Sequence, residues 1–182
     1  MRTATPPEGN GDSTPGGADF FDKARMFAAV GLVLAGLCGI AGSVLDWAVI
    51  TERQVAENVD FGEATDEIEA GQGKPFTGLE ARDGWYTLAA GALVIVAAGL
   101  LLATKRSGYA WLAFWASVLA GGIAFADYRG LGDAAAAISQ RMDVGAEANA
   151  GPGLTLVAAG AMLGLISAVA AVAATPRGLR DS

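Results

Sequence analysis

The sequence predicts an all-α membrane protein, a four-transmembrane-helix bundle with a short β-hairpin and a short helix in its outer loops. Three observations support this fold class: 53% of the 182 residues are hydrophobic, four long runs carry no charge, and basic residues flank those runs on alternate connections. A soluble chain is usually less apolar. About 20 apolar residues are needed to cross a hydrocarbon core of about 30 Å.

The four charge-free runs place the expected spans at about residues 26–45, 84–104, 108–126 and 154–174. A charge at the centre of a span costs about 2.5–3.5 kcal/mol on insertion scales, so its absence supports insertion. The first run is longer than the apolar core of a signal peptide, and we expect an uncleaved anchor; a signal peptide cleaved near Ala41-Gly42-Ser43 is the alternative. Residues 20–182 then form the membrane domain. Residues 1–19 are rich in Pro, Gly, Ser and Thr and are expected to be a disordered cytoplasmic tail.

Charge sets the expected orientation. If the four helices alternate in direction, one side receives the basic flanks Lys23, Arg25, Lys105, Arg106, Arg177 and Arg180. The opposite side receives two outer loops, residues 46–83 and 127–153, which together contain 14 acidic and 5 basic residues. Because basic residues favour the cytoplasmic side, both termini are expected in the cytoplasm of a cell whose plasma membrane the chain spans.

The outer loops contain signs of local structure. WAVITERQV, from Trp47, is rich in β-branched residues and is expected to pair with PFTGLEA, from Pro75, as a β-hairpin. DAAAAISQRMD, from Asp133, is expected to be a short helix near the membrane surface, with Asp133 as its N-cap. Aromatic residues at the span ends are expected to form interfacial belts: Trp47, Trp85, Tyr86 and Tyr128 outside, and Tyr109 and Trp111 inside.

Small residues recur at every fourth position of the spans. Close backbone approach stabilises helix pairs in lipid, so the candidate helix-packing residues are Gly31, Gly39, Gly160 and Gly164. Packing inside the bundle is the favoured interpretation. The alternative is that Gly160 and Gly164 dock a partner helix or a second copy of the chain.

A candidate outer-face polar cluster consists of Asp46, Arg82, Asp127 and Arg129. The two aspartates are expected at the outer ends of the first and third helices, where a negative charge opposes the helix dipole. Ion pairs with Arg82 and Arg129 are the simplest compensation. A cation or proton site and a partner contact remain alternatives.

Several kinds of chemistry have no support in the sequence. Histidine is absent and Cys38 is the only cysteine, so no catalytic triad, disulfide or usual zinc site is expected. The acidic group Glu63, Asp66, Glu67 and Glu69 lacks the spacing of a calcium loop and is expected to be solvated. No cofactor or metal is expected. The net charge of −7 argues against binding to nucleic acid.

The chain also contains a faint internal repeat. GIAGSVLDW, from Gly39, corresponds to GIAFADY, from Gly122, and TLAAGA, from Thr87, corresponds to TLVAAGA, from Thr155. A duplication of a helix–loop–helix unit and a chance match in Ala/Gly-rich sequence are both open interpretations.

Two short motifs carry a resemblance. Gly78-Leu79 with Asp83-Gly84 precedes the second span, and Gly151-Pro152-Gly153-Leu154 precedes the fourth. Over roughly residues 24–175 the chain resembles small four-transmembrane-helix proteins of unknown function that are common in actinobacteria. The resemblance implies membrane location and four helices, but no activity. The chain departs from members that begin with a zinc ribbon, because it lacks the ligands. Asp83 is expected to cap the second helix.

The functional expectation follows from these patterns. Two acidic outer loops and spans without ionisable groups favour a non-enzymatic accessory or scaffold protein, with a membrane or envelope protein, or a second copy, as partner. A small transporter or channel component is the alternative, although transport usually needs ionisable groups or broken helices near the midplane. A membrane enzyme ranks third.

Overall fold

Four long helices and one small sheet make up the computed structural model, which describes residues 15–53, 74–80, 82–142 and 145–174. The helices are α1 (Pro15–Val44), α2 (Gly84–Thr104), α3 (Gly108–Met142) and α4 (Pro152–Ala173). Each contains a segment long and apolar enough to cross a membrane. The predicted four-helix membrane fold is therefore confirmed, and α2 coincides with its predicted span.

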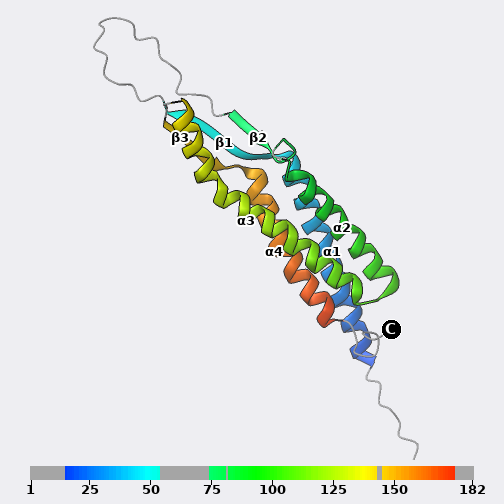
Figure 1. Cartoon of the computed structure of the whole chain (residues 1–182). Coiled ribbons are helices and arrows are strands. Elements are labelled where there is room, and N and C mark those ends of the chain that lie inside the picture. Colours follow the sequence, from blue (N-terminus) through cyan, green and yellow to red (C-terminus); the bar gives the residue numbers. More distant parts are fainter. Residues whose placement is uncertain (1–14, 54–73, 81, 143–144, 175–182) are drawn as a thin grey trace, which may run out of the picture.

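The helices form a ring in which α1 contacts α2 and α4, and α3 contacts the same two neighbours. The tight connection at Lys105, Arg106 and Ser107 joins α2 to α3 at one end, here called the turn end (Figure 1). The first turn of α1 and the last turn of α4 lie at this end too. The sheet lies at the opposite end, called the sheet end.

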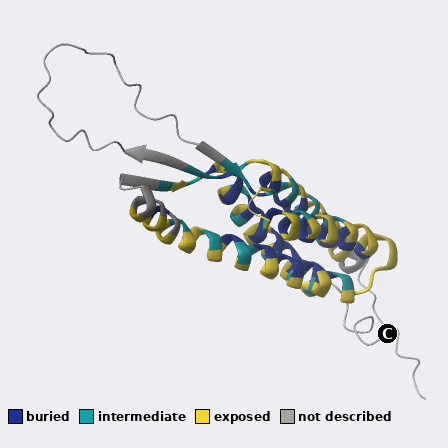
Figure 2. Ribbon diagram, turned by 45° about the horizontal axis from the view of Figure 1, so that its top comes forward, coloured by how far each residue is buried: buried dark blue, intermediate teal, exposed yellow. Residues whose placement is uncertain are grey.

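The burial pattern suits a bundle in lipid. Buried and exposed residues alternate along each helix (Figure 2). Most buried residues are small, whereas Leu34, Val96 and Ile166 are exposed. Lipid tails are as apolar as leucine, so large side chains lose nothing by facing them, and close helix contacts come from small residues.

Helix length distinguishes α3 from its neighbours. At 1.5 Å per residue, the 21 residues of α2 and the 22 residues of α4 span about 32 and 33 Å, close to the hydrocarbon thickness. The 35 residues of α3 span about 52 Å. Because α3 starts at the turn end, its excess length projects beyond the bundle at the sheet end (Figure 1).

The short separate helix predicted from Asp133 is wrong in one respect: this segment is helical, but it is the continuation of α3. Gly130 and Gly132 were expected to lie in a loop, yet both are helical. Glycine costs only about 1 kcal/mol in a helix. Packing offsets that cost, since Leu131 packs against the buried cluster of Trp47 and Leu154.

The sheet has three antiparallel strands in the order β2-β1-β3: β1 (Asp46–Arg53), β2 (Lys74–Thr77) and β3 (Gly145–Ala150). Ala48 pairs with Phe76 on one side and with Ala150 on the other. The predicted hairpin of β1 and β2 is confirmed. The strand β3 was not predicted, because its sequence GAEANA has low β-propensity and its pairing depends on the free edge of β1.

The helix α1 starts earlier than its predicted span. It begins at Pro15, so residues 15–19 are helical and do not belong to the predicted disordered tail. Residues 1–14 and 175–182 lie outside the described residues. So does the acidic group Glu63, Asp66, Glu67 and Glu69.

Candidate functional site

Trp47 anchors the sheet to the bundle. It was expected in an interfacial belt, but it is only 3% exposed and belongs to a buried cluster with Leu154 and Val157. Its indole Nε1 donates a hydrogen bond of 2.7 Å to the carbonyl oxygen of Gly42. Trp47 is therefore a core residue, whereas Trp85, Tyr86 and Tyr128 are exposed near this end.

Glycines close the loops around Trp47. The Gly151 N–H donates to the Trp47 carbonyl oxygen at 2.7 Å, and the Gly84 N–H donates to the Gly78 carbonyl oxygen at 2.9 Å. A Cβ atom added to Gly153 would lie 2.6 Å from the Gly42 carbonyl oxygen. Both short glycine motifs of the sequence thus allow close backbone contacts at the point where the sheet meets the helices.

The predicted ion pairs of the outer-face polar cluster are not formed. Within the described part of the chain, no ion pair joins Asp46 or Asp127 to Arg82 or Arg129. Arg82 is exposed with a φ of 72°. The Arg129 guanidinium carbon lies 5.3 Å from the centroid of the Phe125 ring. Asp127 and Arg129 are two residues apart on one helix, so their side chains do not face each other.

Asp127 instead lies beside a second carboxyl group. Its Oδ2 atom is buried and has no hydrogen-bond partner in the described structure, and its carboxyl group interacts with that of Asp83. Asp83 occupies the N-cap position of α2, but its side chain makes no cap hydrogen bond, contrary to expectation. This pair was not predicted from the sequence, although both residues adjoin the outer ends of their predicted spans: Asp83 precedes the second span and Asp127 follows the third.

A cavity of about 260 Å³ opens next to Asp127, beneath the sheet. Its lining comes from β1, α3 and α4: Trp47, Ala48, Ala126, Asp127, Gly130, Leu131 and Leu154. Asp127 is the only ionisable residue in the part of the lining that the structure describes. A carboxyl group in such an apolar setting suits a proton, a cation or a hydrogen-bond donor. Among the described residues no group of three potential metal ligands is found.

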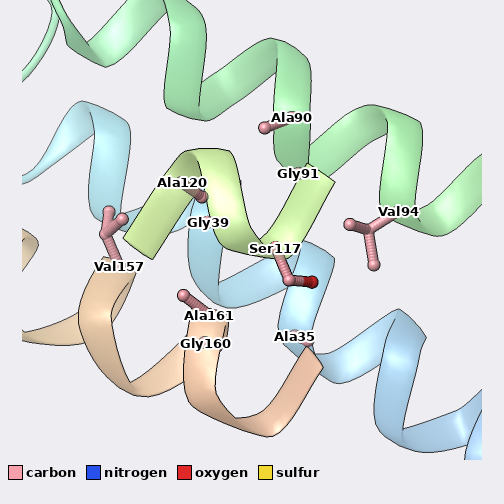
Figure 3. A pocket seen from close by; sticks show the side chains of 10 residues that line it. All are labelled: Ala35, Gly39, Ala90, Gly91, Val94, Ser117, Ala120, Val157, Gly160 and Ala161. Atoms are coloured by element: carbon pink, nitrogen blue, oxygen red, sulfur yellow. The ribbon is translucent and has the colours of Figure 1, made fainter. Parts of the chain in front are cut away.

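The centre of the bundle is closely packed. A space of only about 10 Å³ remains there, lined by ten residues of which none is ionisable (Figure 3). Ser117 is the only one with a polar side chain, and its hydroxyl donates to the Ala113 carbonyl oxygen at 2.9 Å. A cavity of about 10–15 Å³ is the minimum for one water molecule, so this space is no pathway.

The four candidate helix-packing glycines all lie at contacts between helices of the bundle. Gly31 faces Ser167 of α4, and Gly39 faces Gly91 of α2. The remaining two face the first and third helices: Gly160 faces Cys38 of α1, and Gly164 faces Ser117 of α3. The Gly160/Gly164 face is thus occupied within the chain.

The residues that suggested a repeat have different environments. Trp47 is buried at the start of a strand, while Tyr128 is 63% exposed within a helix. Thr87 is buried and Thr155 is exposed. The two halves of the chain, α1 with α2 and α3 with α4, each form a contacting pair of helices. The residues matched in the sequence, however, do not occupy equivalent environments.

The fold and the site define a class: a four-helix membrane protein with a small sheet anchored on one end of its bundle. Comparison with known proteins adds no narrower class, because no protein family and no curated protein is matched by this sequence.

Proposed function

We propose that this chain is a non-enzymatic accessory or scaffold protein of the cell membrane, acting through protein contacts at its sheet end. The observation that carries the proposal is a contrast between the two parts of the molecule. Small side chains fill the bundle centre and leave an internal space of about 10 Å³. The sheet end, by contrast, has three strands, a projecting part of α3 and a buried tryptophan that holds them together.

The charge of the two predicted outer loops supports a partner with a basic surface. In the sequence these loops, residues 46–83 and 127–153, contain 14 acidic and 5 basic residues. Complementary charge accelerates association and excludes partners of the same sign. A membrane or envelope protein with a basic patch is the proposed partner.

The proposed orientation places the turn end in the cytoplasm. The described side chains near that end include the basic residues Lys23, Arg25, Lys105 and Arg106 and the acidic residue Asp22. Basic residues near span ends favour the cytoplasmic side. A C-terminal fluorescent protein that matures only in the cytoplasm should fluoresce, and a dark fusion with full expression would reverse the orientation.

A photo-crosslinking experiment in living cells tests the proposed contact. A photoreactive phenylalanine analogue replaces Tyr128, which is 63% exposed near the sheet end, or Trp115, which is 62% exposed on the lipid face. We expect a discrete protein adduct from position 128 and only lipid adducts from position 115. Absence of protein adducts from Tyr128, Tyr86 and Glu80 in fully expressed protein would overturn the proposal.

The second candidate function is that of a small transporter or channel component. The observation that favours it is the 260 Å³ cavity beside the buried Oδ2 atom of Asp127. The packed bundle centre opposes it. Flux into liposomes should be compared between the wild type, Asp127→Asn and Asp46→Asn. Flux that Asp127→Asn alone abolishes would favour transport over the scaffold role, and no flux in any of the three would remove this candidate.

A further inference from the structure

A second apolar cavity lies on the side of the bundle, between α3 and α4. It has a volume of about 330 Å³ and is lined by Trp111, Phe114, Ala168, Val169, Val172 and Ala173, here called the lateral groove. The wall on α3 is large and aromatic, and the wall on α4 includes two alanines. This difference in side-chain size accounts for the space between the two helices.

Aromatic contacts shape the α3 wall of the lateral groove. The ring of Phe114 packs edge to face against Trp111, with centroids 5.5 Å apart, and against Trp115, with centroids 5.4 Å apart. Edge-to-face contacts of this kind stabilise aromatic pairs beyond the burial of area alone. These ring contacts therefore shape the α3 wall of the lateral groove in the structure.

The depth of the lateral groove limits its occupant. Trp111 is the fourth residue of α3, about 4.5 Å along the helix axis from the first, and Ala173 is the last residue of α4. The groove therefore covers the part of the bundle next to the turn end. In a bilayer that the four helices span, the ends of the helices lie where the hydrocarbon core meets the interface. At this depth the medium around the bundle consists of acyl chains just below their headgroups.

Cationic side chains lie in the connection that precedes the α3 wall of the lateral groove. Lys105 and Arg106 in the α2–α3 connection are both exposed. The Lys105 Nζ atom is 3.9 Å from the Asp22 carboxylate, which also pairs with Arg25. Arg106 forms no ion pair with any described residue. A guanidinium group of this kind suits the phosphate of a lipid headgroup, and basic residues near a bilayer attract anionic lipids.

We propose that the lateral groove binds one acyl chain of an anionic phospholipid, whose phosphate group contacts Arg106. The apolar walls of the groove bind the acyl chain, and the basic α2–α3 connection favours a negatively charged headgroup. Neither contact alone would distinguish this site from ordinary lipid around the bundle. A single basic residue near the surface contributes about 1 kcal/mol, so we expect an approximately fivefold preference for an anionic over a zwitterionic lipid.

Quenching of tryptophan fluorescence measures this preference. The full chain with Trp85→Phe and Trp115→Phe retains Trp111 in the groove and the buried Trp47 as an internal reference. It is reconstituted in phosphatidylcholine vesicles that contain a small fraction of either phosphatidylglycerol or phosphatidylcholine with brominated chains. Brominated phosphatidylglycerol should quench Trp111 at about a fivefold lower mole fraction.

Two pairs of variants separate the groove from general attraction of charge. Ala173→Phe fills the groove, and Ala170→Phe adds the same side chain at an exposed position outside it. Arg106→Gln removes the charge near the groove, and Arg129→Gln removes one near the sheet end. We expect Ala173→Phe and Arg106→Gln to abolish the preference, and their matched controls to keep it. Unchanged far-ultraviolet circular dichroism verifies folding.

Three results would overturn the proposal. The first is equal quenching by the two brominated lipids. The second is a preference that survives Ala173→Phe in folded protein, since general charge attraction would then explain it. The third is quenching that decreases as protein density in the vesicle rises, because a second copy of the chain would then occupy the groove.

Discussion

The indole Nε1 of Trp47 donates a hydrogen bond to the carbonyl oxygen of Gly42 across 2.7 Å. Gly42 lies in the last turn of α1, where carbonyl groups have no partner within the helix. Trp47 is the second residue of β1. One side chain thus satisfies the end of a membrane helix and fixes the direction in which the sheet leaves it.

Trp47→Phe should destabilise the protein and loosen the sheet. Phenylalanine fills much of the same space but cannot donate, and a buried carbonyl oxygen without a partner costs about 1–3 kcal/mol. The free energy of unfolding in detergent should fall by that amount, and amide exchange in β1 and β3 should accelerate. Trp85→Phe, at a residue 60% exposed, is the matched control and should change stability by less than about 0.5 kcal/mol. Equal effects of the two substitutions would contradict the anchoring role.

Substitution by alanine at two glycines of α2 should change the free energy of unfolding differently. A Cβ atom added to Gly91 would lie 2.7 Å from the Gly36 carbonyl oxygen of α1, whereas one added to Gly99 meets no atom within 4 Å. Gly91→Ala should therefore destabilise the bundle by about 1–3 kcal/mol, the usual cost of overpacking. Gly99→Ala should be neutral or stabilise by up to about 1 kcal/mol, because alanine favours the helix. Denaturant titration of both variants measures the difference, and a Gly91→Ala variant as stable as Gly99→Ala would show that α1 and α2 do not approach closely at Gly91.

The sequence predicted the spans because the bilayer imposes a simple rule of length and charge. The span at residues 84–104 and the hairpin of β1 and β2 could be predicted without knowledge of tertiary packing. The continuation of α3 could not be predicted without the tertiary packing. Gly130 and Gly132 indicate a loop in the sequence, and only the packing of Leu131 against the cluster of Trp47 explains the helix. The strand β3 also depends on tertiary contacts, because alanine and asparagine pair there only through the edge that β1 offers.

The candidate site was harder to predict than the fold. Asp127 was identified from its position at a span end, but its neighbours were assigned by depth alone, and depth does not tell which side chains face each other. Arg129 points to Phe125, while Asp83 approaches from another helix. Trp47 was placed at the interface because tryptophan is common there, and only the three-dimensional contacts identify it as a core residue.

The hydroxyl groups of Ser43 and Thr87 should be energetically coupled. They lie 2.8 Å apart, both buried, and join α1 to α2. Hydrogen bonds between membrane helices average about 0.6 kcal/mol, with a maximum near 1.7 kcal/mol. A double-mutant cycle with Ser43→Ala and Thr87→Val should give a coupling in that range. The cycle of Thr87→Val with Ser117→Ala is the control and should be additive, since no hydrogen bond joins these two described side chains. Additivity in both cycles would leave the Ser43–Thr87 contact without energetic weight.

Substitutions at Gly132 should distinguish a continuous α3 from a loop followed by a separate helix. Gly132 is exposed, and an added Cβ atom there would meet nothing within 4 Å, so side chains other than proline fit. In a continuous helix, Gly132→Ala should stabilise the projecting segment by up to about 1 kcal/mol and slow its amide exchange about fivefold. Gly132→Pro should remove a helical hydrogen bond and cost about 3 kcal/mol, which accelerates exchange in the same segment. If residues 127–132 were instead a loop, neither substitution would change the amide exchange of residues 133–142. Hydrogen exchange of these two variants therefore decides whether the sheet packs against a continuous extension of the third membrane helix.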